Sequence, residues 1–330
     1  MGRSLYWLWL VVAFASAGFA QEKIPTTLSF DEEADGPVVD SRTLEVQLTS
    51  KKQLTITLRP APTSATRPAA DDAARPAEKL AGLETGSVKK DGDVFVIAYD
   101  FSRGSGAEDF GVTGAKVEGG VLGVEPNTPN AAGKKFSSLR LPRLVRTPLN
   151  VNVTPSAALP THGVGLFWPN GDGKEEWLDI HVGEARLVVN RVTNNDWAAR
   201  KTTEVPIKPN EPTHISMLLP AAHLPTEAPI SVRFSGGHSK LELARFQVRG
   251  RVVGRFGVGF GPSLAVATLV DGPGMRAGLQ PGDVLTKIDA FAPKTPVEAA
   301  EFLKRFSPGD KSIWTVRRDG KTARVQVVAE

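Results

Sequence analysis

The 330-residue chain contains no cysteine, only two tyrosines and three methionines, and its charge is nearly balanced, with 40 basic and 36 acidic residues giving a net charge of +4. Without cysteine the chain has no disulfides, thiol catalysts or cysteine zinc sites, so its stability must come from packing. The basic residues are dispersed and show no nucleic-acid-binding signature. A hydrophobic content of 41% is ample for buried cores, and the length predicts two or three domains.

The first 20 residues have the pattern of a secretory signal peptide. Arg3 precedes an apolar run at residues 5–14, and small residues follow as far as Ala20. An apolar run of about ten residues is shorter than the roughly 20 that a membrane-spanning helix needs. We therefore expect cleavage after Ala17 or Ala20, a periplasmic or extracellular protein, and no transmembrane segment after signal removal. An uncleaved anchor is the less favoured alternative.

Residues 21–85 predict a hairpin followed by a linker. Apolar and polar residues alternate weakly at 44–48 and 54–58, which favours an N-terminal β-hairpin region over residues 21–59. Four prolines and many alanines then fill residues 60–76, a composition that buries too little surface to order itself. We expect a Pro/Ala-rich linker over residues 60–85. The sequence leaves open whether the hairpin is a separate module or joins a later sheet.

Residues 86–250 predict an antiparallel β-sandwich. Short runs rich in Val, Ile, Leu and Phe are interrupted about every 8 to 12 residues by Gly, Pro or Asn. In one hairpin, a two-residue turn at Gly183 and Glu184 would place Ile180 opposite Leu187, with apolar residues sharing one face. The segment resembles a concanavalin-type or laminin-G-type jelly roll, and this resemblance implies a sugar-binding sandwich or a glycosidase.

The opposite face of that hairpin carries a candidate glycan contact. Trp177, Asp179 and His181 stand at alternate positions and offer an aromatic plate with two hydrogen-bonding groups, as a sugar requires. The favoured alternative is structural: Trp177 packs under a loop, and Asp179 pairs with Arg186.

The sequence shows no recognisable catalytic or metal site. Retaining glycosidases of the resembled fold carry a Glu-x-Asp-x-Glu strand, but residues 177–181 have Trp and His in place of both glutamates. There is no Gly-x-Ser-x-Gly motif, and the five histidines lack metal-ligand spacing. We therefore predict a protein that is not an enzyme and that uses no cofactor and no metal.

Residues 251–330 carry the most specific motifs. Residues 257–260 read Gly-Val-Gly-Phe, and residues 277–283 read Ala-Gly-Leu-Gln-Pro-Gly-Asp. The segment resembles a PDZ domain of the bacterial exported type, whose carboxylate-binding loop reads Gly-Leu-Gly-Phe. The resemblance implies a small β-barrel with two helices that captures protein C-termini. Glycines at Gly257 and Gly259 would let backbone N–H groups converge on an anion, and an open sheet edge would accept a peptide as an added strand.

The predicted groove lies between this loop and a helix at residues 296–306. Thr295 is the expected N-cap and Glu298 the capping-box partner. The expected apolar face includes Val297, Ala300, Leu303 and Phe306, at spacings of three. The candidate peptide-binding residues are Arg255, Phe256, Gly257, Val258, Gly259, Phe260, Ala300, Leu303 and Lys304.

Two departures from the PDZ pattern stand out. Pro262 follows the loop closely and offers no N–H, so the groove is expected to be short. Ala290 occupies a turn position where the family often has glycine, so this turn must differ or bear strain.

Together these observations predict a mainly β protein in which a jelly-roll-like antiparallel sandwich is followed by a small PDZ-type barrel with two helices. The predicted function is that of an exported, non-catalytic binding or scaffold protein recognising protein C-termini or extended peptide segments. The alternative is a carbohydrate-binding or carbohydrate-active protein acting through the sandwich. A protein or peptide is the expected partner, a polysaccharide is a second possibility, and nucleic acid is not expected.

Overall fold

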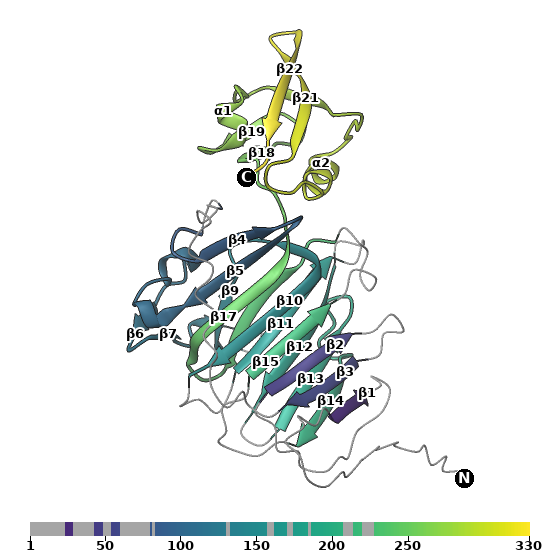
Figure 1. Ribbon diagram of the computed structural model, residues 1–330. Helices are drawn as coiled ribbons and strands as arrows, with labels where there is room; N and C mark the ends of the chain where they lie inside the picture. The colour runs from purple at the N-terminus through teal and green to yellow at the C-terminus, as the bar shows by residue number, and fades with distance from the viewer. Residues whose placement is uncertain are drawn as a thin grey trace, which may run out of the picture.

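A computed structural model describes residues 24–28, 43–48, 54–59, 80, 83–129, 133–156, 162–169, 174–183, 186–206, 214–219 and 228–330. Within these residues the chain is mainly β, as predicted, with antiparallel sheets and few helices. Two large sheets lie beneath a smaller C-terminal unit (Figure 1). The predicted signal peptide, and residues 60–79 of the predicted linker, lie outside the described residues.

The first large sheet has ten strands among the described residues, in the order β1-β3-β2-β15-β10-β17-β5-β4, with β7 pairing with β17 and β6 with β7. Its strands are β1 (Ile24–Leu28), β2 (Thr43–Leu48), β3 (Leu54–Arg59), β4 (Ser87–Asp91), β5 (Val94–Asp100), β6 (Ala115–Glu118), β7 (Val121–Val124), β10 (Val145–Pro155), β15 (His214–Leu219) and β17 (Leu241–Val252). Because β2 runs parallel to β15, the N-terminal hairpin belongs to the sandwich sheet. Of the two alternatives that the sequence leaves open, the hairpin therefore joins a later sheet.

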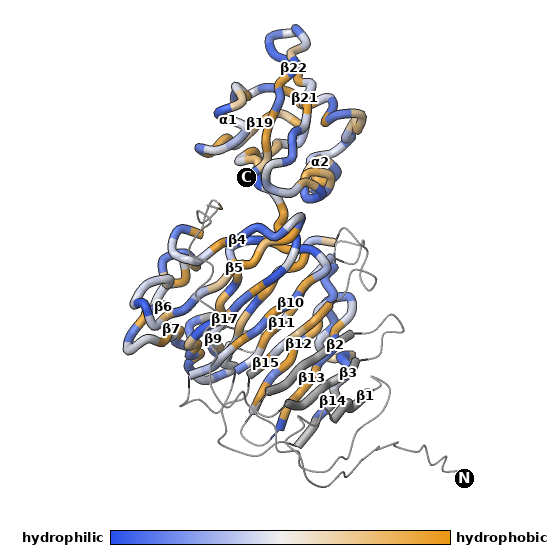
Figure 2. Tube along the Cα trace, viewed as in Figure 1, coloured by the Kyte–Doolittle hydropathy of each residue, from blue (hydrophilic) through white to orange (hydrophobic). Residues whose placement is uncertain are grey.

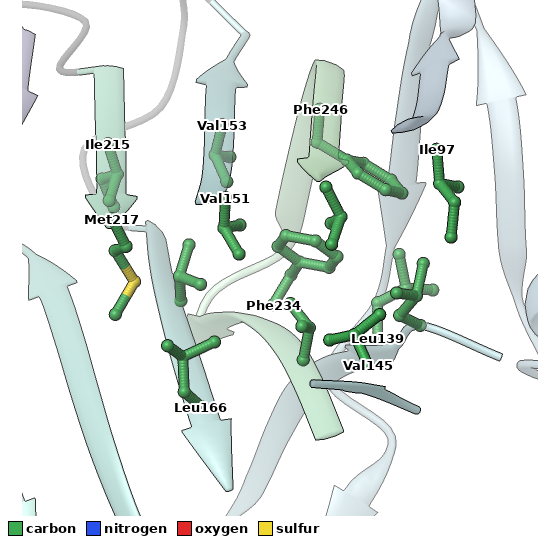
Figure 3. Close-up of a cluster of buried hydrophobic side chains, with 14 of the residues drawn as sticks. Ile97, Leu139, Val145, Val151, Val153, Leu166, Ile215, Met217, Phe234 and Phe246 are labelled. Carbon is green, nitrogen blue, oxygen red and sulfur yellow. The ribbon is translucent and has the colours of Figure 1, made fainter. Parts of the chain in front are cut away.

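The second large sheet has seven strands within the part of the chain that the structure describes, in the order β14-β13-β12-β11-β16-β9-β8. They are β8 (Thr128–Pro129), β9 (Lys135–Arg140), β11 (His162–Pro169), β12 (Glu175–Val182), β13 (Arg186–Val192), β14 (Lys201–Pro206) and β16 (Ser231–Gly237). Hydrophobic positions run along β10, β11 and β12 (Figure 2). Side chains from both sheets, such as Val151, Leu166, Phe234 and Phe246, gather in one buried core (Figure 3).

The hairpin formed by β12 and β13 corrects the predicted register. Ile180 lies opposite Val189, not Leu187, and Gly183 N–H donates to Arg186 O at 2.7 Å, so Gly183 pairs with Arg186 and the connection comes one position later than the predicted turn. The shift is two residues. Because side chains alternate with a period of two, the apolar set still faces the core although each facing pair is wrong.

The sandwich begins before the predicted boundary at residue 86. Leu80 and Leu83 are buried in its core. The Asp109 carboxylate accepts hydrogen bonds from the backbone N–H groups of Thr85 and Gly86, at 3.0 and 3.2 Å, and from the Tyr99 hydroxyl at 2.6 Å. The predicted linker is therefore wrong in its last residues, because two leucines and a shared carboxylate anchor them. Two 3₁₀ helices, η2 (Phe101–Arg103) and η3 (Glu108–Phe110), lie in this part of the sandwich.

We expect Asp109→Asn to lower the free energy of unfolding of the sandwich by about 1–3 kcal/mol, because a charged hydrogen-bond acceptor is lost. Burial alone would raise the pKa of Asp109, but hydrogen bonds from Tyr99, Thr85 and Glu84 hold it below its usual range. A lowered folded-state pKa stabilises the fold above about pH 4, and this stabilisation is lost as the pH falls through the folded-state pKa. Urea unfolding at pH 7 and pH 3 measures both effects. An equal loss of stability at the two pH values would contradict this account.

The C-terminal unit contains two short sheets and two helices. Its elements are β18 (Val258–Phe260), β19 (Val266–Leu269), α1 (Pro273–Arg276), β20 (Val284–Ile288), α2 (Pro296–Leu303), β21 (Lys311–Arg318) and β22 (Lys321–Val328). Strands β18 and β19 form one sheet and β20-β21-β22 the other, and both pack around Trp314. No helix within the described residues is long and apolar enough to cross a membrane.

Candidate functional site

The turn into β18 depends on one glycine. Gly257 has a φ of 68°, in the left-handed region, and a Cβ at this position would lie 3.2 Å from Val270 Cγ2 and 3.3 Å from Val270 O. Gly259, by contrast, lies within β18 opposite Thr268. The sequence predicts a loop in which Gly257 and Gly259 both allow backbone N–H groups to converge. In the structure only Gly257 forms a turn, and a strand follows it directly.

Strand β18 has a free edge. Val270 N–H donates to Gly257 O at 3.0 Å, and Gly261 N–H donates to Ala265 O at 2.8 Å. Because hydrogen-bonded positions alternate along an antiparallel pair, the intervening Val258 and Phe260 direct their N–H and C=O groups away from β19. Among the described residues, β18 pairs with β19 alone. The opposite edge therefore presents two residues with outward-facing donors and acceptors.

The free edge is short. Strand β18 has three residues and ends at a turn in which Leu264 N–H donates to Gly261 O at 3.0 Å. Pro262 lies inside this turn, where its missing N–H costs nothing. The structure thus has the short edge that Pro262 predicts.

The aromatic residues of the motif belong to the core. Phe256 is buried, with its ring centroid 5.5 Å from that of Phe306 and 5.4 Å from that of Trp314. Val258 and Phe260 are half-buried, and Phe260 lies 6.0 Å from Trp314. The Phe256 side chain is therefore not available to a ligand, which corrects its assignment as a binding residue.

Helix α2 begins as predicted but turns a different face to the core. Thr295 Oγ1 accepts from Glu298 N–H at 3.1 Å, while Glu298 Oε2 accepts from Lys294 N–H at 2.8 Å. The helix ends at Leu303, not at residue 306. Ala299 is buried, whereas Val297 is 69% exposed. The predicted apolar face is wrong at Val297 and Ala300, because Ala299 and Phe302 take their places, whereas Leu303 and Phe306 pack on the core as expected.

The three predicted helix residues differ in exposure. Ala300 is exposed, Leu303 is mostly buried, and Lys304 is half-buried with its ammonium group paired to Glu301. Both α2 and β18 pack on the same core, so Ala300 and Lys304 are the members of this set that remain accessible.

The turn at Ala290 avoids the expected strain. Ile288 and Phe291 exchange backbone hydrogen bonds of 2.8 and 2.9 Å across residues 289 and 290. Asp289 takes the left-handed conformation, with a φ of 52°, and its Oδ1 accepts from Ile313 N–H at 2.7 Å. Aspartate tolerates this conformation better than alanine does, so Ala290 needs no glycine.

Two buried arginines join the sandwich to the C-terminal unit. Arg143 and Arg146 are only 1% and 2% exposed. Arg143 Nη2 donates to Glu330 O at 2.6 Å, and Arg146 donates to Arg305 O at 2.6 Å and to Ser307 Oγ at 2.7 Å. The sequence offered no signal for these contacts, because their partners lie more than a hundred positions further along the chain.

A cavity of about 440 Å³ opens where the two units meet, beside the start of the motif. Arg255 lines it, and Arg255 Nη2 donates to Pro142 O at 2.5 Å. Burial lowers the pKa of Arg255 from its ordinary value. The arginine predicted to contact a ligand carboxylate therefore faces the sandwich across this cavity. The lining residues are Phe110, Arg140, Leu141, Pro142, Arg143, Leu144, Val253, Gly254, Arg255 and Lys304.

The predicted glycan contact has no open aromatic plate. The Trp177 ring stacks between Phe167, at a centroid distance of 5.3 Å, and Trp197, at 6.3 Å. Arg233 covers the Phe167 ring at 3.8 Å, and Arg200 lies over Trp197 at 4.7 Å. The Trp177 ring thus packs against Phe167 and against Trp197, which lies in the loop between β13 and β14, as the favoured structural alternative expects.

Asp179 and His181 likewise serve the sheet. Asn190 Nδ2 donates to Asp179 Oδ2 at 3.3 Å, whereas Arg186 pairs with Glu204 at 2.8 Å, so the predicted Asp179–Arg186 pair is wrong. Burial raises the pKa of Asp179, although the charge of His181 and the bond from Asn190 act in the opposite direction. Within the described residues, no three His, Asp or Glu side chains are grouped so as to hold a metal.

No protein-family model matches the chain, and no curated protein matches it. Among solved structures, the chain is similar to the HtrA-type protease AlgW with decapeptide, at 13% identity over 74% of this chain and 81% of that chain, with a TM-score of 0.24. It is also similar to the serine endoprotease from Yersinia pestis, at 12% identity over 72% of this chain and 93% of that chain, with a TM-score of 0.22.

These matches correct one expectation. The matched proteins are proteases, and we therefore withdraw the prediction that the chain is not an enzyme. At these TM-scores the likeness transfers neither an activity nor a site to this chain.

We expect Gly257→Val to weaken peptide binding at β18 and to destabilise the C-terminal unit by about 2 kcal/mol, because a left-handed conformation is costly for a branched residue and its Cβ would crowd Val270. Gly320→Val is the matched control. Gly320 also has a positive φ, of 75°, but a Cβ there meets nothing within 4 Å. Chemical unfolding and peptide-binding titrations compare the two. Equal peptide binding by both variants would show that the turn at Gly257 does not position the site.

Proposed function

We propose that this chain binds an extended polypeptide segment as a strand added to the free edge of β18, as a PDZ domain does, with protein C-termini as the preferred ligands. The observation that carries the proposal is the outward direction of the N–H and C=O groups of Val258 and Phe260. An added strand would satisfy these groups by main-chain hydrogen bonds, which are largely independent of ligand sequence. Side chains of the ligand would then face α2, where Ala300 leaves room beside the helix.

The motifs at residues 257–260 and 277–283 support this proposal. In the structure they place the turn at Gly257 next to α1, where Gly274 N–H donates to Phe256 O at 2.9 Å. Gly274 itself packs against the Val258 side chain, leaving no space for a Cβ. Helix α1 and the residues around the turn at Gly257 are therefore packed together, which fixes the direction of β18.

We further propose that the protein acts outside the cytoplasm, because residues 1–20 have the pattern of an export signal.

Peptide-display selection on the full chain tests the proposed function. Selected peptides are then synthesised with a backbone N-methyl group at each position in turn. If the ligand adds a strand, N-methylation should weaken binding at alternate positions, by about tenfold for each lost hydrogen bond, because only every second N–H points to β18. Uniform tolerance of N-methylation, or no selected peptide at all, would contradict strand addition.

A further inference from the structure

The cavity between the sandwich and the C-terminal unit, called the basic cavity below, has four cationic side chains in its wall and no acidic residue there. The four cations are Arg140, Arg143, Arg255 and Lys304. Lys304 pairs with Glu301, whereas neither Arg140 nor Arg255 forms an ion pair with another residue that the structure describes. The basic cavity therefore carries an excess of positive charge.

The arginines of this wall differ in exposure. Arg143 is only 1% exposed, and its Nη2 donates to Val253 O at 3.1 Å and to Glu330 O at 2.6 Å, which fixes the guanidinium in place. Arg140 and Arg255 are exposed. The wall thus combines one buried, fixed cation with two cations that a solute can reach.

These charges are costly in the absence of an anion. Burial, followed by the nearby charge of Arg255, lowers the pKa of Arg143 to about 10, with Glu330 acting in the opposite direction. A bound anion would relieve the repulsion between the arginines and accept charge-assisted hydrogen bonds from them. Planar guanidinium groups bind the paired oxygens of a phosphoryl group particularly well.

The size and the apolar part of the wall indicate a ligand larger than a simple ion. The volume of about 440 Å³ falls within the range of about 300–1,000 Å³ typical of small-molecule sites. Pro142 and Leu144 also line the basic cavity, and both are only half-buried. They offer an apolar surface on which a small organic group could lie while its phosphate contacts the cations.

We propose that the basic cavity binds the phosphoryl group of a small solute, inorganic phosphate or a phosphate monoester, and that the bound phosphate holds the two units together. Arg140, at the end of β9, and Arg143 belong to the sandwich, whereas Arg255 and Lys304 belong to the C-terminal unit. A ligand that contacts both units binds best when they are docked, so its binding stabilises the docked arrangement. This role goes beyond peptide binding at β18 and does not depend on it.

Isothermal titration of the full chain with inorganic phosphate tests the site. Arg140→Gln and Lys304→Gln should each weaken binding about tenfold, because each removes one charge-assisted contact, one from either unit. Glu301→Gln should instead strengthen binding about two- to threefold, because it releases Lys304 from its ion pair. Arg317→Gln is the matched control and should change nothing, since Arg317 is an exposed arginine on β21 that does not line the basic cavity.

Limited proteolysis near residues 252–256 tests whether phosphate holds the units together. Phosphate should slow cleavage of the unmodified chain but not of the Arg140→Gln variant. Sodium chloride at the same ionic strength is the control for general screening of charge. A parallel titration with glycerol 3-phosphate distinguishes the two sources of the phosphoryl group. Tighter binding of the ester supports an organic ligand, and tighter binding of inorganic phosphate supports the free ion.

The remaining outcomes would overturn the inference. Without saturable binding of either compound, or with Arg140→Gln behaving like Arg317→Gln, the basic cavity is not a phosphate site. If phosphate binds but leaves the cleavage rate unchanged, or if sodium chloride slows cleavage equally, phosphate does not join the two units. None of these results bears on peptide binding at β18, so the proposed function stands or fails separately.

Discussion

Trp314→Ala is expected to lower the free energy of unfolding of the C-terminal unit by about 3–5 kcal/mol, the usual cost of emptying a tryptophan site in a core. Trp314 is fully buried, its ring contacts Phe256 and Phe260, and its Nε1–H donates to Ser312 Oγ at 2.8 Å. Since these two phenylalanines flank the turn at Gly257, the same substitution should abolish peptide binding. In differential scanning calorimetry, the transition of the C-terminal unit should move to a lower temperature while the transition of the sandwich stays unchanged.

Trp197→Ala provides the matched control. Trp197 is 48% exposed and belongs to the stacked aromatic row of the sandwich, so its removal should cost much less and leave peptide binding intact. If the Trp314→Ala variant kept full affinity for peptide, packing around Trp314 would not be needed to position the free edge of β18.

A double substitution of Arg143 and Arg146 to Met should uncouple the two units. Each guanidinium donates to backbone carbonyls of the C-terminal unit, and hydrogen bonds from charged groups contribute about 1.5–3 kcal/mol each. Methionine keeps much of the side-chain volume, so the cost should come mainly from the lost bonds and the carbonyls left without donors. Small-angle scattering should report a larger radius of gyration, and proteolysis near residues 252–256 should accelerate.

Arg249→Met controls for the loss of an arginine from the same sheet. Arg249 is exposed and pairs with Asp91 at 2.7 Å, a surface pair of small energetic value. Unchanged scattering and proteolysis in the double variant would mean that the chain connection and apolar packing suffice to fix the two units.

The sequence predicts those parts of the structure that local chemistry determines. The N-cap at Thr295, the short edge before Pro262 and the apolar face of β12 all follow from residue type and spacing within a few positions. The register of the β12–β13 hairpin does not, because a turn that comes one position later shifts every facing pair by two residues and preserves the same buried face.

Features that depend on distant partners escaped prediction. Val297 suits the apolar face of α2 by spacing, but the position of Phe291, whose ring stacks on Phe302 at 4.3 Å, decides which side of the helix is covered. Arg143 and Arg146 look like ordinary sandwich residues until residues 305–330 fold against them. The basic cavity has the same origin, since its walls come from four separated segments of the chain.

The parallel pairing of β2 with β15 has a consequence for assembly of the sandwich. The strand at residues 43–48 contributes to the sheet only after the strand at residues 214–219 is available, because β15 is the neighbour that connects it to the rest. Loop closure over such a separation is slow relative to local hairpin formation. During folding, the N–H and C=O groups along the edge of β2 therefore have no partner strand until β15 has formed. Aggregation through this exposed edge is most favoured during that time.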